Sequence, residues 1–149
     1  MELVPLVKHF EGLHRIVTRT PQVTAAPYLC PANFWTIGYG RVVPKDHPLI
    51  DEPTADRFLV EDLAKFRGIV LSLTRPGLTS KQIDALTSFA FNLGGARYRS
   101  STLRAMVNRG EMAGVSDQFR RWVFGGGRKL PGLVLRREAE INLWASRDA

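Results

Sequence analysis

The sequence predicts an α+β fold that is mostly helical, with a small β-rich segment near the N-terminus. Between residues 13 and 50, aromatic and β-branched residues alternate with Pro, Asn and Gly, which is typical of short strands joined by tight turns. From residue 51 to 149, apolar residues recur at helical spacing in one segment after another. The chain of 149 residues is therefore expected to form one domain, with a β-rich part at about 13–50 and a helical part at about 51–149.

A short helix is predicted before the β-rich part, over residues 2–10. Its apolar residues follow the spacing i, i+3, i+4, i+7 that places them on one helical face: Leu3, Leu6, Val7 and Phe10. Gly12 is expected to end the helix, because glycine readily adopts the left-handed conformation found just beyond many helix ends. Glu11 then stands at the helix end, beside the turn into the β-rich part.

The β-rich part divides into two stretches. In the first, Ile16–Thr18 and Val23–Thr24 are predicted as the arms of an enlarged hairpin or of a loop, with residues 19–22 as the turn. In the second, Tyr28–Val43 combines aromatic and β-branched residues with closely spaced turn residues, so it predicts short strands. A turn-rich exit follows at residues 44–48.

The helical part is predicted to contain several helices, which begin and end at recognisable signals. Thr79 and Gln82 have the spacing of a capping box, and Pro131 is suited to the first turn of the last helix. The three glycines at 125–127 are expected to form a flexible loop. The expected helical segments are residues 51–73, 79–93, 100–108, 115–123 and 131–144, and the last of them is expected to bury Leu135, Ile141 and Trp144.

Composition excludes several classes of protein. No apolar run is long enough to cross a bilayer, and the first residues have no basic segment followed by an apolar one, so we expect synthesis without a signal peptide. One cysteine cannot form an internal disulfide, and the scattered histidines predict no metal site. The net charge of +7 fits a nucleic acid, an anionic membrane or an anionic cell wall as partner.

Two stretches carry a family resemblance. Residues 8–12 read K-H-F-E-G, and residues 28–40 read Y-L-C-P-A-N-F-W-T-I-G-Y-G. Together they resemble the phage lysozyme (endolysin) family, glycoside hydrolase family 24, which has F-E-G at a helix end, then a carboxylate or cysteine, five residues and T-I-G-Y-G. Two later blocks, within residues 78–94 and 121–140, are also similar to the family. The resemblance implies a lysozyme-like fold, with a small N-terminal β-lobe and a helical C-terminal lobe around a cleft.

The resemblance also implies a set of site residues. Glu11 corresponds to the catalytic acid, Cys30 takes the place where the family most often has Asp, and Thr36 is the residue expected to hold a water. The sugar-binding cleft is expected to be lined by Val42, Phe91 and Thr102, and Arg136 or Arg137 to pair with Glu11. Five residues separate Cys30 from Thr36, as in the family, but eighteen separate Glu11 from Cys30, which is more than in the family.

The residues alone give a plainer interpretation of Cys30, as a small buried side chain beside a proline. The resemblance instead implies a muramidase that hydrolyses the β-1,4 bond between N-acetylmuramic acid and N-acetylglucosamine in peptidoglycan. It further implies a monomer that lyses the host cell after release from the cytoplasm through a holin. A lytic transglycosylase and a catalytically silent peptidoglycan-binding protein are the alternatives. A nucleic-acid partner is not expected, because no predicted helix has the polar face of a recognition helix.

Overall fold

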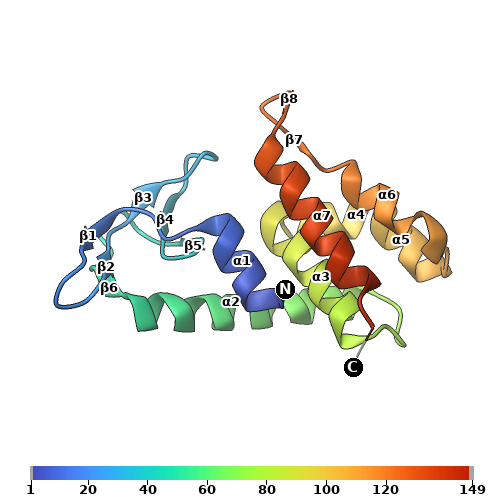
Figure 1. The fold of residues 1–149 in the computed structure, drawn as a ribbon, viewed down its shortest axis with the longest axis horizontal. Coiled ribbons are helices and arrows are strands. Elements are labelled where there is room, and N and C mark those ends of the chain that lie inside the picture. Colours follow the sequence, from blue (N-terminus) through green and yellow to red (C-terminus); the bar gives the residue numbers. More distant parts are fainter. Residues whose placement is uncertain (1, 148–149) are drawn as a thin grey trace. The chain divides into compact units, whose positions relative to one another are not determined.

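The computed structural model describes residues 2–147, and it confirms the predicted α+β, mostly helical fold (Figure 1). The chain divides into two compact units. We call Val7–Ala64 the β-rich unit, and Met1–Leu6 together with Lys65–Ala149 the helical unit. Helices α1 and α2 contribute residues to both units.

The β-rich unit contains six short strands between two helices. These elements are α1 (Leu3–Glu11), β1 (Ile16–Thr18), β2 (Thr24–Ala25), β3 (Tyr28–Leu29), β4 (Trp35–Ile37), β5 (Arg41–Val42), β6 (Ile50–Asp51) and α2 (Glu52–Leu73). The helical unit contains the remainder: α3 (Ser80–Leu93), α4 (Gly95–Ser100), α5 (Thr102–Arg109), the 3-10 helix η1 (Met112–Gly114), α6 (Val115–Arg120), β7 (Phe124–Gly125), β8 (Arg128–Lys129) and α7 (Pro131–Ala145).

The strands of the β-rich unit form two antiparallel sheets. The first has the order β1-β2-β6, so the hairpin is the one of the two alternatives that forms, and it gains a third strand from just before α2. The second has the order β3-β4-β5 and lies in the stretch predicted to form strands. Its β4–β5 turn favours glycine, because Gly38 has φ +64, a left-handed conformation that side chains disfavour.

Charged side chains fasten the second sheet to α2 within the β-rich unit. Arg41 on β5 forms a two-pronged pair with Asp62, in which Nε lies 3.1 Å from Oδ2 and Nη2 lies 2.9 Å from Oδ1. The same guanidinium reaches Glu61 and stacks 3.8 Å from the ring centroid of Phe58. Because these partners are all on α2, Arg41 fixes the position of β5 on the helix.

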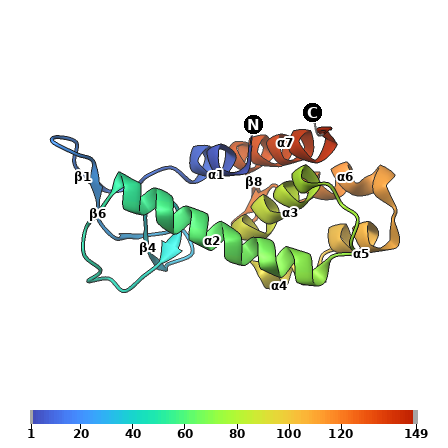
Figure 2. The same cartoon turned by 90° about the horizontal axis from the view of Figure 1, so that it is seen from below.

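The helical unit is built around Phe89 of α3, which is fully buried. The rings of Tyr98, Phe119 and Trp122 meet Phe89 edge to face, with centroids 5.5–6.3 Å apart. Helices α3 and α7 lie side by side in both views (Figures 1 and 2). The predicted capping box of Thr79 starts α3 as expected, since the Thr79 hydroxyl accepts from the Gln82 amide.

A buried ionic cluster joins α7 to α3. Glu140 is fully buried, and its carboxylate lies 2.7 Å from Nε of Arg137 and 3.6 Å from Nε of Arg136. Ser88 of α3 donates its hydroxyl to the same carboxylate at 2.5 Å, and Arg137 also donates to the side chain of Asn92 at 2.8 Å. Each charge therefore has a close partner, which a buried charge requires.

Several elements differ from the prediction. Helix α4 and strand β6 were not predicted, and the glycines at 125–127 lie in a β7–β8 hairpin rather than in a loop without strands. Leu135 was expected to be buried but is 63% exposed, whereas Ile141 and Trp144 are buried as expected. Among residues 2–147, no helix is both long and apolar enough to cross a membrane.

Candidate functional site

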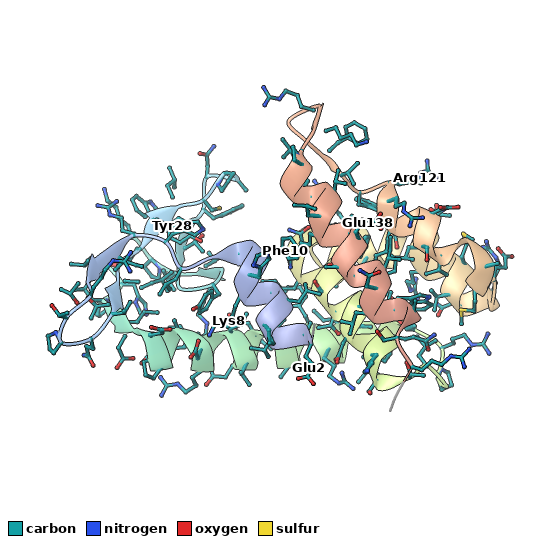
Figure 3. The ribbon with its side chains drawn as sticks, viewed as in Figure 1. Glu2, Lys8, Phe10, Tyr28, Arg121 and Glu138 are labelled. Carbon is teal, nitrogen blue, oxygen red and sulfur yellow. The ribbon has the colours of Figure 1, made fainter. Side chains whose placement is uncertain are left out.

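The register of the second sheet places three site residues in one row. Tyr28 on β3 pairs with Thr36 on β4, and Thr36 pairs with Val42 on β5. Directly opposed residues of antiparallel strands have their side chains on the same face. The predicted catalytic Thr36 and the predicted sugar-binding Val42 are therefore neighbours, with Tyr28 on the other side of Thr36. Figure 3 shows Tyr28 among the strands of this sheet.

Cys30 stands at the turn that joins β3 to β4. Its amide donates to the carbonyl of Phe34 at 3.0 Å, and its carbonyl accepts from the amide of Asn33 at 2.8 Å. Asn33 has φ +64, a conformation that asparagine tolerates better than most residues. Since Cys30 is two residues beyond Tyr28, strand alternation directs its side chain to the face that carries Thr36.

The thiol of Cys30 is half-buried and acidic for a cysteine. Desolvation acts to raise the pKa of the thiol, but hydrogen bonds with the backbone at Phe34 and Ala32 and with the side chain of Thr36 outweigh it, and the pKa is lowered. A lowered pKa increases the fraction of thiolate, which is the nucleophilic and basic form of cysteine. The plainer interpretation, an inert buried cysteine, does not predict this environment.

Thr36 is almost fully buried, with 3% of its surface exposed. Its hydroxyl donates to the carbonyl of Phe34 at 3.0 Å. This bond fixes the side-chain rotamer and leaves the lone pairs of Oγ1 able to accept a further hydrogen bond. Thr36 also contributes to the lowered pKa of the Cys30 thiol, so the two side chains influence each other.

Glu11 is the last residue of α1, where the chain turns into the β-rich unit. Gly12 ends the helix as predicted, since its φ is +71 and its amide donates to the carbonyl of Lys8 at 3.0 Å. The Glu11 carbonyl accepts a 2.7 Å hydrogen bond from Nε2 of His14. The His14 ring in turn packs on the ring of Tyr28, with 4.8 Å between centroids.

Tyr28 links Glu11 electrostatically to the sheet. Burial, reinforced by the negative charges of Glu11 and Cys30, raises the pKa of Tyr28 to about 12. Both charges must be close for this effect, so Glu11 and Cys30 both lie near the Tyr28 side chain, although eighteen residues separate them in the sequence. The extra residues between them form the β1–β2 hairpin.

Phe91 and Thr102, the other two residues expected to bind sugar, belong to the helical unit. Phe91 is half-buried, and its ring meets that of Phe66 edge to face at 5.4 Å. Thr102 is exposed at the start of α5 and lines a pocket of about 300 Å³. The other residues that line this pocket are Ser100, Ser101, Gln118, Arg121 and Trp122.

Two residues of the site were missed by the sequence interpretation. The sequence pattern indicates Tyr28 only as a strand residue, although its position two before Cys30 is the strand period that places both on one face. His14 lies three residues after Glu11, but no general rule distinguishes such a histidine from an exposed loop residue. Across residues 2–147, no group of three or more His, Cys, Asp or Glu side chains is arranged to hold a metal ion.

Comparisons with known proteins agree on one family. The family model described as phage lysozyme matches residues 9–140. The chain is 36% identical to the endolysin of Bacillus phage B103 over 148 residues, which covers 98% of this chain but 53% of that protein. It is 35% identical to the endolysin of Acyrthosiphon pisum secondary endosymbiont phage 1, with 95% of this chain and 93% of that protein covered.

A solved structure gives the same result for the fold. The muramidase domain of SpmX from Asticaccaulis excentricus superposes with a TM-score of 0.81 and 29% identity, and the match covers 97% of this chain and 95% of that one. The chain thus spans almost the whole of this domain, but only about half the length of the B103 endolysin.

Proposed function

Because the chain belongs to the phage lysozyme family, we propose that it is an endolysin that cleaves the β-1,4 bond between N-acetylmuramic acid and N-acetylglucosamine in peptidoglycan. The endolysin relatives and the muramidase domain support a peptidoglycan-degrading glycoside hydrolase. The family match over residues 9–140 carries the proposal, because it includes Glu11, Cys30 and Thr36.

Glu11 is proposed as the general acid. Cleavage of a glycosidic bond requires a proton on the leaving oxygen while positive charge develops on the sugar ring. Glu11 is the last residue of α1, and the hydrogen bond from His14 to its backbone carbonyl holds the main chain from which this acid extends.

Cys30 and Thr36 are proposed to act together on the attacking water. The buried Thr36 hydroxyl has a fixed rotamer and an oxygen able to accept a hydrogen bond from a water. A Cys30 thiolate beside it can take up the proton of that water or stabilise the developing positive charge. Direct attack by the thiolate on the sugar is the other route, and the two routes give opposite stereochemistry at the anomeric carbon.

Val42, Phe91 and Thr102 are proposed to bind the sugar chain. Val42 has 65% of its surface exposed, although it is next to Thr36 in the sheet, so an apolar surface is available beside the proposed catalytic pair. Thr102 and its neighbouring hydroxyl and guanidinium groups suit the polar substituents of amino sugars. No cofactor takes part in this mechanism.

Product analysis tests the proposal. Purified protein is incubated with purified peptidoglycan, and the soluble fragments are separated and their ends identified. Hydrolysis predicts muropeptides with reducing ends, because an enzyme-held water attacks the sugar. Fragments with 1,6-anhydro ends would instead identify a lytic transglycosylase, and binding without release of fragments would identify a silent wall-binding protein.

The place where the protein acts, its oligomeric state and its route of release are part of the same proposal. We propose that the protein acts on the cell wall as a monomer, after release through a holin. Sedimentation of the purified protein tests the monomeric state, and lysis that depends on a co-expressed holin tests the route of release.

A further inference from the structure

One exposed segment of the helical unit combines cations with an exposed aromatic ring. Between Asp117 and Glu138 the sequence has no acidic residue and six Lys or Arg residues. Arg136 and Arg137 are buried, and Arg120 pairs with Glu138. The exposed cations of the β7–β8 hairpin, Arg128 and Lys129, therefore have no acidic neighbour along the chain.

The hairpin presents an apolar side chain beside these cations. Phe124 is 63% exposed, and its register partner across the hairpin is Lys129. Paired residues share a face of the two strands, so the ring and the ammonium group lie on the same side. Arg128 pairs with Gly125, which has no side chain to shield it. We call Phe124, Arg128 and Lys129 the hairpin patch.

The base of the hairpin is held firmly by its own unit. The amide of Leu130 donates to the carbonyl of Val123 at 2.9 Å. Gly125 packs so closely that a Cβ there would lie 2.6 Å from Cδ1 of Leu130. In Figure 1 the hairpin extends past the first residues of α7, within the helical unit. The patch is thus a projecting surface on a fixed base.

The chemistry of the patch suits one class of partner. A carbohydrate or phosphate polymer would attract the two cations, and a sugar face can stack on the Phe124 ring, so a wall polymer is the competing partner that the test below must separate from a bilayer. A bilayer that contains anionic phospholipid accepts both groups, because its headgroups attract cations and its interface takes up an aromatic ring. We propose that the hairpin patch docks on an anionic phospholipid surface and holds the protein next to the membrane.

Binding to vesicles tests this proposal without reference to enzymatic activity. The protein is sedimented with vesicles of phosphatidylcholine alone, and with vesicles in which phosphatidylglycerol replaces part of it. Partition is expected only onto the anionic vesicles. Phe124→Ser should weaken it about tenfold, and Arg128→Ser and Lys129→Ser about fivefold each.

Two control variants remove similar side chains elsewhere in the helical unit. Leu71→Ser removes another exposed apolar side chain, and Lys65→Ser removes another exposed cation. Both should bind the vesicles as the unchanged protein does. Circular dichroism checks that every variant is folded, which is expected because the changed side chains are exposed.

Two results would overturn the proposal. One is equal loss of binding in Arg128→Ser, Lys129→Ser and the control Lys65→Ser, because the net charge alone would then explain the attraction. The other is a patch variant that binds vesicles normally but loses binding to lipid-free peptidoglycan, because the patch would then recognise the wall. A Phe124→Trp variant gives an independent measurement, since its fluorescence should shift to the blue with anionic vesicles if the ring enters the interface.

Discussion

At the scale of single residues, Cys30 determines which chemistry the proposed site can perform. An aspartate in its place would be anionic throughout the neutral range, whereas a thiol is anionic only above its pKa. The hydrogen bonds with the backbone and with Thr36 lower that pKa and so bring the thiol closer to the behaviour of a carboxylate. The same bonds make the thiolate available as a base or as a nucleophile.

The pH dependence of alkylation should report this environment. A lowered pKa means that the folded protein reaches its thiolate form at a lower pH than the unfolded chain does. The rate of reaction with iodoacetamide should therefore rise with pH around a midpoint below that of the protein in urea. A midpoint equal to or above that of the unfolded chain would contradict the assigned hydrogen bonds.

Substitution of Cys30 separates catalysis from packing. Cys30→Asp supplies a permanent anion in the same position and should keep activity on peptidoglycan within about tenfold of the unchanged protein. Cys30→Ala removes the group that faces the water and should lower activity by about a hundredfold or more. If the alanine variant were fully active while the aspartate variant unfolded, Cys30 would be a packing residue and its catalytic role would be withdrawn.

At the scale of elements, the second sheet is positioned by its turns and by a set of contacts with α2. We call Arg41 and its partners Asp62, Glu61 and Phe58 the clamp. Strands of two or three residues make few ladder hydrogen bonds, so they need other contacts to hold a fixed place. Arg41 supplies these through Asp62, Glu61 and Phe58 of α2. Because β5 pairs with β4, the clamp also fixes the strand that carries Thr36.

Removal of the clamp should reduce stability. Arg41→Ala breaks a two-pronged ion pair whose partner Asp62 has only 16% of its side chain exposed, so the free energy of unfolding should fall by about 2 kcal/mol in urea titrations. The matched control Arg57→Ala breaks an exposed pair 3.8 Å from Glu61 and should cost about 0.5 kcal/mol or less. Equal losses in the two variants would show that the clamp does not hold the sheet.

The elements that the sequence predicted are those with a local signal. The capping box at Thr79, Gly12 beyond α1 and Pro131 at the start of α7 all act within one helical turn, and each prediction is confirmed. Strand β6 was missed because its two residues become a strand only through the partner β2, which is distant in sequence. Burial of Leu135 was predicted wrongly, because helical spacing cannot say which face of α7 meets the core.

The residues of the candidate site divide in the same way, into those that a short sequence interval predicts and those that only the folded chain brings together. The interval from Cys30 to Thr36 was informative because both lie in one small sheet, where a short separation fixes the geometry. The approach of Glu11 to Tyr28 depends on how α1, the long β1–β2 hairpin and the second sheet pack together. No spacing in the sequence specifies that arrangement, so the sequence does not indicate Tyr28 and His14 as residues of the site.

At the scale of the whole molecule, the net charge of +7 is not evenly distributed. The β-rich unit has six Lys or Arg and seven Asp or Glu residues, so it is close to neutral. The helical unit has fifteen and seven, and it carries all of the excess positive charge. The attraction to an anionic surface therefore belongs to the helical unit, whereas Glu11, Cys30 and Thr36 belong to the other.

This distribution predicts a salt effect on activity. Positive charge on the helical unit should concentrate the protein on anionic cell walls, and salt should screen that attraction over a distance of about 10 Å at 0.1 M. Turnover of whole walls should fall as sodium chloride is raised, while turnover of short soluble fragments should change much less. A rate on whole walls that does not vary with salt would remove charge from the binding step.

The most direct test of the proposed mechanism is the rate at which Glu11→Gln releases fragments from purified peptidoglycan. The substitution keeps the size and polarity of the side chain but removes its acidic proton. The rate should fall by about 10²–10⁴-fold, the usual contribution of a general acid, while the unfolding curve stays unchanged. Glu2→Gln, the same change at an exposed residue just before α1, should leave the rate unaltered. A Glu11→Gln protein that releases fragments at the unchanged rate would contradict the assignment of Glu11 as the acid and the mechanism built on it.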